Sequence, residues 1–350
     1  MTGIHDVARA TGVSTATVSR ALRGLPNVSP ETRQLVEEAA TRLGYVPSRT
    51  AQGLSSGRHQ AIAVVVPSMG RWFDTKVFEG VDSVLRRAGY DTFLINLAAG
   101  PSTRERLFHN ALLRKRTDAV IALGIDFTQE EREQLQSLAM PAMVVGTPLL
   151  NLRSVGIDDE AAAELAMQHL LDLGHRRIGH IGGETEYGMN LSVGQFRMAA
   201  WRHALLAHGV EPQDHLLAMG AFMMPQAKVA ARAMLDREDR PTAVFAGSDE
   251  MAFGVLVAAA ELGLRVPRDL SVVGIDDHDW SESLGLTTVH QDPFEQGRRA
   301  ATIVVDELAE GSAEAVLLTG TYHLVVRRST APPRVVDESL ARRRTAEAPG

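Results

Sequence analysis

From residue 61 onward, apolar stretches of strand length alternate with amphipathic stretches of helix length. Stretches that are apolar throughout predict parallel strands covered on both faces by helices. About nine such strands over roughly 270 residues exceed what one open sheet usually holds, so we expect two doubly wound subdomains facing a cleft. The clearest strand stretches are 61–67, 90–97, 119–125, 141–146, 177–183, 242–247 and 271–276, and the helix stretches are 76–88, 160–173, 192–208, 251–262 and 293–310.

The first 45 residues have no strand pattern and predict three short helices, at 4–11, 15–22 and about 30–43. Gly12 can adopt the positive φ that ends the first helix, and Ser14 can cap the second. Ser29 is a plausible cap for the third helix, which Gly44 ends. We expect the third helix to present one apolar stripe, made of Leu35, Val36, Ala39 and Leu43.

A polar, glycine-bearing segment at 47–59 separates the helical start from the alternating region, and Leu54 is the apolar residue that stands out in it. This composition is typical of a linker. The expected units are a helical domain at 1–46, a linker at 47–60, an α/β core at 61–338 and a tail at 339–350. Within the core, one subdomain takes about 61–158 and 291–320, and the other about 159–290 and 321–338.

Composition narrows the possible functions. The 350 residues are 45% hydrophobic and 23% charged, as in an ordinary globular protein. The sequence contains no cysteine, which excludes disulfides, a thiol nucleophile and cysteine-held metals. No apolar run reaches the roughly 20 residues of a membrane helix, and the N-terminus lacks the layout of a signal peptide. We therefore expect a cytoplasmic protein with no membrane partner.

The net charge of −7 is unevenly distributed. Residues 1–60 hold seven arginines and four acidic residues, a net charge of +3, which leaves −10 for the rest of the chain. A basic helical start on an acidic body is consistent with nucleic-acid binding.

Two groups of sequence motifs occur in order along the chain. The N-terminal blocks are Asp6-Val7-Ala8, Gly12-Val13-Ser14, Thr17-Val18-Ser19-Arg20, Val28-Ser29-Pro30-Glu31-Thr32-Arg33 and Leu43-Gly44-Tyr45-Val46-Pro47. The later blocks include Asp172-Leu173-Gly174-His175, Asp249-Glu250-Met251-Ala252, Val266-Pro267-Arg268-Asp269-Leu270 and Val326-Arg327-Arg328-Ser329-Thr330. Together they resemble the LacI/GalR family of bacterial transcription regulators, the N-terminal blocks its DNA-binding domain and the later blocks its effector-binding core. The resemblance implies a helix-turn-helix head on a periplasmic-binding-protein-like core.

The resemblance also assigns DNA contacts. It places Thr15, Ala16 and Arg20 at the base-reading positions of the second helix, where an arginine can donate a bidentate pair to guanine. Thr17 and Ser19 are better placed to hold phosphates. The DNA-binding set further includes Arg23, which stands where the family usually has Asn, and Asn27.

In the linker, the resemblance implies a short hinge helix that forms on DNA. The residue matching Leu54 wedges into the minor groove, with Ala51 one turn earlier; such a wedge bends the duplex. Gly53 disfavours helix formation and should leave the hinge disordered off DNA. The alternative is that Leu54 folds onto the nearest protein surface.

For the effector pocket, the resemblance points to Phe73, Arg197, Phe222, Ser248 and Asp276. Arg197 and Asp276 offer the donors and acceptors that clamp vicinal hydroxyls, and the two phenylalanines offer flat faces for a ring. Trp280 is a weaker candidate for the same pocket. A Gly146-Thr147 pair stands where the family often has Asp-Arg, which argues against a carboxylate or phosphate ligand there.

Other apparent motifs predict no enzyme, cofactor or metal. The G-x-S-x-G pattern at 53–57 lies in the linker rather than on a strand-to-helix elbow. The run Asp276-Asp277-His278-Asp279 cannot aim all four side chains inward from one strand end. His175 and His180 are expected at the surface or in caps rather than as ligands.

These observations predict a homodimeric regulator, a repressor, that binds a near-palindromic double-stranded operator. A small effector, which in most members of the family is a sugar, would change the angle between the subdomains and thereby the affinity for DNA. The tail lacks leucine heptads, which favours a dimer over a tetramer. Two alternatives stay open, a regulator that needs a purine-like corepressor and a sugar-binding receptor without a DNA role.

Overall fold

The computed structural model describes residues 3–45, 59–97, 104–105, 113, 116–137, 140–146, 153–183, 191–311 and 317–334. The hinge residues Ala51 and Leu54, the G-x-S-x-G pattern, and Thr147 lie outside the described residues.

The head consists of three helices with the predicted bounds, α1 (Ile4–Thr11), α2 (Thr15–Leu22) and α3 (Pro30–Leu43). Gly12 and Gly44 take the left-handed conformation at the ends of α1 and α3, with φ of 71° and 63°. Ser14 Oγ accepts a hydrogen bond from the backbone N–H of Thr17 at 3.1 Å, and Ser29 caps α3 in the same way. The predicted turn and caps are therefore confirmed.

One detail of the head differs from the prediction. Leu35 is not part of the buried stripe of α3, since 47% of it is exposed. The buried residues of this helix are Val36, Ala39 and Ala40, which pack against Val7 and Val18. Leu35 lies about 100° around the helix from Val36, which places it at the edge of the buried face.

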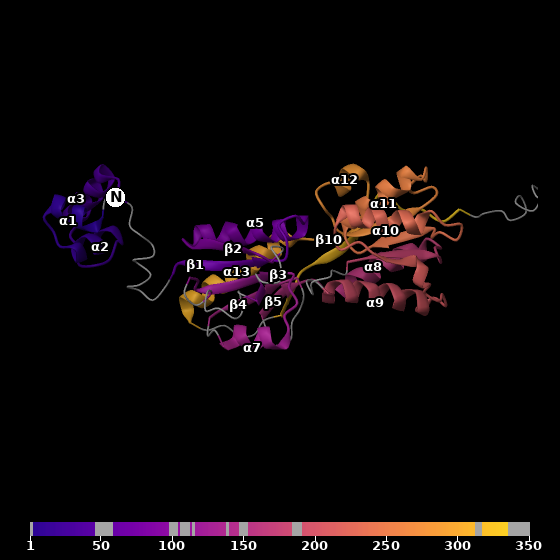
Figure 1. Cartoon of the computed structure of the whole chain (residues 1–350), viewed down its shortest axis with the longest axis horizontal. Coiled ribbons are helices and arrows are strands. Elements are labelled where there is room, and N and C mark those ends of the chain that lie inside the picture. The colour runs from indigo at the N-terminus through magenta and orange to yellow at the C-terminus, as the bar shows by residue number, and fades with distance from the viewer. Residues whose placement is uncertain are drawn as a thin grey trace, which may run out of the picture.

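Within the described residues, the core contains two six-stranded sheets, one in each subdomain (Figure 1). Every neighbouring pair of strands runs parallel except β10 and β12, which are antiparallel. The first sheet has the order β11-β5-β4-β3-β1-β2, with β1 (Ala61–Val66), β2 (Asp91–Asn96), β3 (Ala119–Leu123), β4 (Ala142–Val145), β5 (Arg153–Gly156) and β11 (Leu317–Thr319). The second has the order β12-β10-β9-β8-β6-β7, with β6 (Ile178–Gly182), β7 (Leu217–Met219), β8 (Ala243–Ala246), β9 (Ser271–Asp276), β10 (Thr287–Gln291) and β12 (Tyr322–Val325).

The estimate of about nine strands is too low. The described residues contain twelve, and all seven clearest predicted stretches are among them. The strands that the sequence did not reveal are short, such as β7 and β11 with three residues each, or rich in polar residues, such as β10. Runs of three residues carry too little apolar periodicity to stand out from loops.

Helices cover both sheets. The first subdomain has α5 (Trp72–Arg87), α7 (Gln129–Ser137) and α13 (Pro293–Glu310), while the second has α8 (Asp159–Asp172), α9 (Leu191–Ala207), α10 (Met224–Leu235), α11 (Asp249–Glu261) and the short α12 (Ser281–Leu284). The chain passes between the subdomains three times, from β5 to α8, from β10 to α13, and from β11 to β12. Within the described residues, none of these helices has the length and apolar character to cross a bilayer.

Candidate effector pocket and DNA-binding surface

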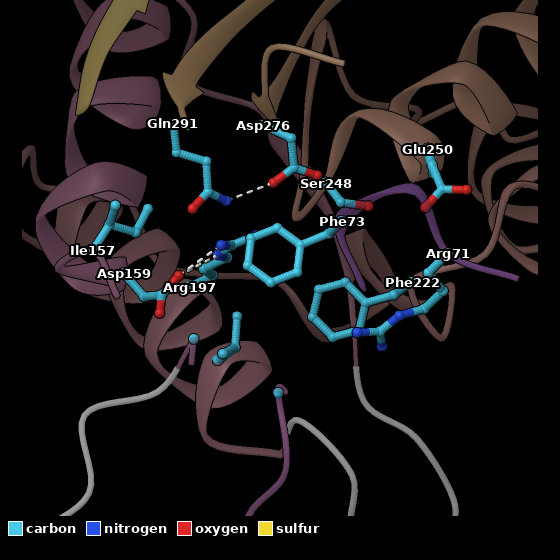
Figure 2. Close-up of a pocket in the computed structure, with 13 residues that line it drawn as sticks. Arg71, Phe73, Ile157, Asp159, Arg197, Phe222, Ser248, Glu250, Asp276 and Gln291 are labelled. Atoms are coloured by element: carbon cyan, nitrogen blue, oxygen red, sulfur yellow. Dashed lines mark hydrogen bonds and ion pairs between the residues drawn. The ribbon is translucent and has the colours of Figure 1, made fainter. Parts of the chain in front are cut away.

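A pocket lies between the two subdomains and is lined by the ends of strands from both sheets (Figure 2). Its empty space is about 510 Å³, part of which opens to solvent. Gly124, Gly146 and Ile157 follow β3, β4 and β5 of the first sheet, and Ser248, Asp276 and Gln291 stand at the ends of β8, β9 and β10 of the second. Ligands of open α/β sheets bind at the carboxyl ends of the strands, which is where this pocket is found.

Arg197 comes from α9 and is 5% exposed. Its Nε and Nη2 donate to Asp159 Oδ1 at 3.0 and 2.6 Å, and its Nη1 donates to the carbonyl of Gly247. Burial raises the pKa of Asp159, while the adjacent guanidinium opposes that rise. The pair holds the planar guanidinium in place, and the remaining N–H groups of Arg197 stay available for a ligand.

Asp276 ends β9, and only one of its carboxylate oxygens has a protein donor among the described residues. Oδ1 accepts a hydrogen bond from the amide of Gln291 at 2.7 Å, and Gln291 in turn accepts one from Gln296 at 2.9 Å. Burial raises the pKa of Asp276 to about 8, and the nearby charge of Asp249 adds to that rise. Asp276 therefore presents to the pocket one carboxyl oxygen that has no donor among the described residues.

The backbone at this point is unusual, because two successive non-glycine residues have positive φ, 131° at Asp276 and 55° at Asp277. Such conformations cost of order 1–3 kcal/mol each and persist where surrounding contacts impose them. Asp249 supplies these contacts. Its fully buried carboxylate accepts hydrogen bonds from the hydroxyls of Ser281 at 2.5 Å and Thr288 at 2.6 Å and from the backbone N–H of His278 at 3.0 Å.

The phenylalanines form the apolar part of the lining. Phe73 lies in the first turn of α5, and its ring is drawn in the middle of the pocket in Figure 2. Phe222 is 7% exposed, and the guanidinium of Arg71 lies 5.3 Å from its ring centre. One face of Phe222 is therefore occupied by a protein cation, which leaves Phe73 as the better stacking surface for a ligand.

The start of α5 also connects the two subdomains. Arg71 donates two hydrogen bonds to the buried carboxylate of Asp74, at 2.9 and 3.1 Å. The next residue, Trp72, donates its backbone N–H to Glu250 of α11 at 3.2 Å and its indole N–H to Asp279 at 3.1 Å. On the opposite flank, the backbone N–H of Ser192 donates to Asp126 at 2.8 Å, so contacts bridge the cleft on two sides.

The structure brings five of the six predicted effector residues to one pocket. Ser248 lines it while its Oγ also caps α11 by accepting from Met251 N at 3.3 Å. Trp280 is the exception, because it is 61% exposed and is not part of the lining. Its ring contacts His278 and Phe253 instead.

Sequence reasoning missed four polar residues of the lining, Arg71, Asp159, Glu250 and Gln291. Gln291 ends β10 and Asp159 follows β5, and neither strand was among the clearest predicted strand stretches, so the place of these two residues at the cleft gave no signal. Arg71 and Glu250 gave none either, since each lies at the beginning of a helix whose orientation the sequence does not state.

The predicted DNA-contacting residues within the described residues lie on α2 and the turn after it. Ala16, Arg20, Arg23 and Asn27 are exposed, whereas Thr15, Thr17 and Ser19 are half-buried. Arg23 donates from Nε to the carbonyl of Ser19 at 3.3 Å, and Asn27 has a positive φ of 69°.

The placement of two histidines was wrong. His175 and His180 are buried rather than at the surface, with 1% and 0% exposed. His175 hydrogen-bonds Thr242 and the carbonyl of Ala331, and His180 lies in β6 of the second sheet. Within the described residues, no group of three or more histidine or acidic side chains is arranged to hold a metal.

Comparison with known proteins assigns the two parts of the chain. Residues 3–48 match the model of bacterial regulatory proteins of the lacI family, and residues 167–330 match a periplasmic binding protein-like domain. Catabolite control protein A of Priestia megaterium is 31% identical over 331 residues, which cover 93% of this chain and 98% of that protein. The HTH-type transcriptional repressor CytR of Escherichia coli strain K12 is 33% identical over 333 residues, covering 93% of this chain and 96% of CytR.

Solved structures of similar proteins lead to the same family. The lac repressor dimer bound to operator and the anti-inducer ONPF superposes with a TM-score of 0.82 at 27% identity, covering 94% of this chain and 99% of that one. A complex of the transcriptional regulator CelR with cellobiose gives a TM-score of 0.69 at 32% identity, covering 94% of this chain and all of that one. The chain therefore belongs to the lacI family of bacterial regulatory proteins, and it is a DNA-binding transcriptional regulator with a ligand-binding core, not an enzyme.

Proposed function

We propose that this regulator is a repressor whose operator affinity is controlled by a small hydroxyl-rich ligand, a sugar or related polyol, bound between the subdomains. The observation that carries the proposal is the pairing of an oriented arginine, Arg197, with the open carboxylate of Asp276 in one pocket. Together they offer donors and an acceptor for hydroxyl groups, beside the apolar ring of Phe73. Relatives that are repressors, and one in complex with cellobiose, support this choice.

Control of DNA binding follows from the position of the pocket. Its lining comes from both subdomains, so a ligand contacts both at once and favours one angle between them. If the conformations with different angles bind the operator with different affinities, the ligand shifts the operator affinity. By linkage, DNA must then shift the affinity for the ligand by the same factor. We propose that the ligand acts as an inducer, releasing the protein from its operator.

On the DNA side, we propose a homodimer that places one head on each half-site of a near-palindromic operator. Thr15, Ala16 and Arg20 would read bases, and Thr17 and Ser19 would hold phosphates. The working units are the head at 1–46, the hinge at 47–60 and the core at 61–338. As a regulator of DNA, the protein would act in the cytoplasm.

A second candidate ligand is a purine-like corepressor. The ring of Phe73 in the pocket favours it, because a flat base can stack on a phenyl face. The match of residues 3–48 to a regulatory-protein family disfavours a receptor without a DNA role.

Two measurements test the proposal. A thermal-shift screen of the full-length protein against monosaccharides, disaccharides and nucleosides identifies the ligand, since a native-state ligand at a hundredfold excess over its dissociation constant stabilises by about 2.7 kcal/mol. Fluorescence anisotropy with an operator selected from genomic DNA then measures affinity with and without that compound. We expect a polyol to weaken operator binding; a nucleobase that strengthens it would favour the corepressor alternative, and no stabilisation by any polyol would contradict the proposal.

A further inference from the structure

The two arginines of the pocket are already neutralised within the protein. Arg71 makes two hydrogen bonds to Asp74, and Arg197 makes two to Asp159. Asp74 is fully buried and Asp159 nearly so. Each guanidinium therefore has a buried carboxylate of its own, and the pairs add no net charge to the lining.

Two further carboxylates line the same pocket. Asp276 is 5% exposed, and its hydrogen-bond donor is the neutral amide of Gln291. Glu250 is half-buried, and a neutral backbone N–H, that of Trp72, donates to it. The two guanidinium groups thus belong to a cluster with four acidic groups, Asp74, Asp159, Glu250 and Asp276, and the buried Asp249 lies next to Asp276. Acidic groups outnumber basic groups at the pocket.

This excess is unfavourable without a ligand. Burial and the neighbouring carboxylates raise the pKa of both Asp276 and Glu250, although the arginines oppose the rise. The other carboxyl oxygen of Asp276 has no donor among the described residues, and Figure 2 shows it on the side of Ser248. A cation brought into this pocket would favour the ionised form of Asp276, which releases its proton, and the resulting charge-assisted hydrogen bond is of the strong kind.

We propose that the ligand of this pocket carries a protonated amine beside its hydroxyl groups, as an amino sugar does, and that the ammonium group binds the free oxygen of Asp276. The inference rests on the proposed function and refines its ligand class. The hydroxyl groups of the ligand then bind the remaining N–H groups of Arg197. Anionic ligands such as sugar phosphates are rejected, because the carboxylates would repel them.

Pairs of compounds that differ in an amino group test whether the positive charge of the ligand contributes to binding. Isothermal titration calorimetry of the full-length protein at neutral pH compares D-glucosamine with D-glucose, D-galactosamine with D-galactose, and D-glucosamine with N-acetyl-D-glucosamine. We expect the amine to bind at least tenfold more tightly than its neutral partner in one or more pairs. The variant Asp276→Asn should remove this preference, and Glu250→Gln should reduce it. Asp239→Asn, which removes an exposed acid paired with Arg237 away from the pocket, should preserve it.

The outcomes separate the two proposals. If the neutral sugars bind as tightly as the matching amino sugars and alter operator affinity, the proposed amine-bearing ligand is overturned while the proposed function is supported. If no compound of the three pairs binds, the proposed amine-bearing ligand is also overturned. The wider screen of polyols then decides whether the proposed function holds. A tenfold amine preference that survives Asp276→Asn would overturn the assignment to Asp276.

Discussion

Single buried polar residues set the chemistry of this protein. Asp249 shows how: one carboxylate accepts hydrogen bonds from Ser281, Thr288 and the backbone of His278, and so holds the loop that follows Asp276. Position 274, in the strand before Asp276, requires glycine, because a Cβ there would lie 2.2 Å from Asp249 Oδ1. The direction in which Asp276 faces the pocket therefore depends on a residue that does not line it.

His180 should make stability depend on pH. Burial lowers the pKa of His180 to about 4, from 6.5 for a free histidine, and its Nδ1 donates to the carbonyl of Phe245 at 2.9 Å. Between these two pH values the unfolded chain binds a proton that the folded protein does not, so the free energy of unfolding falls as pH drops from 6.5 toward 4. This difference in pKa corresponds to roughly 3 kcal/mol in the free energy of unfolding.

The measurement is urea unfolding of the protein and of His180→Gln at several pH values between 7.5 and 4.5. Asp249 and Asp276 have raised pKa values and act in the opposite direction, so the comparison of the two proteins isolates His180. We expect the variant to lose less stability toward acid pH. Parallel pH profiles would show that His180 does not titrate in this way.

Arg20 should determine base preference rather than general affinity. It is exposed near the end of α2 and free to reach a groove. Arg20→Ala should cost about 1–3 kcal/mol on the best operator and flatten the preference among operator variants. Arg42→Ala, in the last turn of α3, serves as the control for lost charge in the same domain. An unchanged ranking of operator variants in a competition gel shift would remove Arg20 from base reading.

At the scale of elements, the pairing of α5 with α13 connects the pocket to the first subdomain. The two helices approach closely because each has a glycine at the contact. A Cβ on Gly80 would lie 2.0 Å from the carbonyl oxygen of Phe294, and one on Gly297 would lie 2.1 Å from that of Val77. Because Arg71 is the N-cap residue of α5 and Phe73 lies in its first turn, the position of this helix decides the shape of the pocket.

Gly80→Ala should therefore destabilise the core by about 2–3 kcal/mol, since backbone cannot yield as a side chain can. It should also weaken binding of any pocket ligand, because the start of α5 moves. Glu79→Ala, on the exposed side of the same helix, should change stability little. The check is thermal and urea unfolding of both variants, and a Gly80→Ala protein as stable as Glu79→Ala would contradict the close packing.

At the scale of the whole molecule, a basic head is joined to an acidic core that binds the ligand. The contacts at the start of α5 and at Ser192 bridge the two subdomains, so the angle between them is set by interactions on both flanks of the pocket. We propose that this angle affects DNA binding through the linker segment at 47–60.

Leu54 provides the test of that path, although it lies outside the described residues. Leu54→Ala should reduce operator bending and operator affinity while leaving ligand binding intact, because the family resemblance assigns Leu54 to the DNA and not to the effector. A gel-shift phasing assay measures the bending, and calorimetry with the pocket ligand is the control. Unaltered bending would show that Leu54 does not wedge into the minor groove.

The sequence by itself determined the features whose causes are local. The bounds of α1, α2 and α3 followed from caps and turn residues such as Ser14, Gly12 and Gly44, which act within one helical turn. The long apolar strands followed from their uniform composition. Motifs in order along the chain indicated the family and, through it, five of the lining residues.

Only the tertiary structure decided which of these residues act on one another. Arg197 pairs with Asp159, 38 positions away, and Trp72 reaches Glu250 across 178 positions. The burial of His180, the exposure of Trp280 and the strands of three residues were decided in the same way. The physical reason is that a side chain's charge state and partners depend on which distant elements pack beside it, and neither composition nor periodicity specifies that packing.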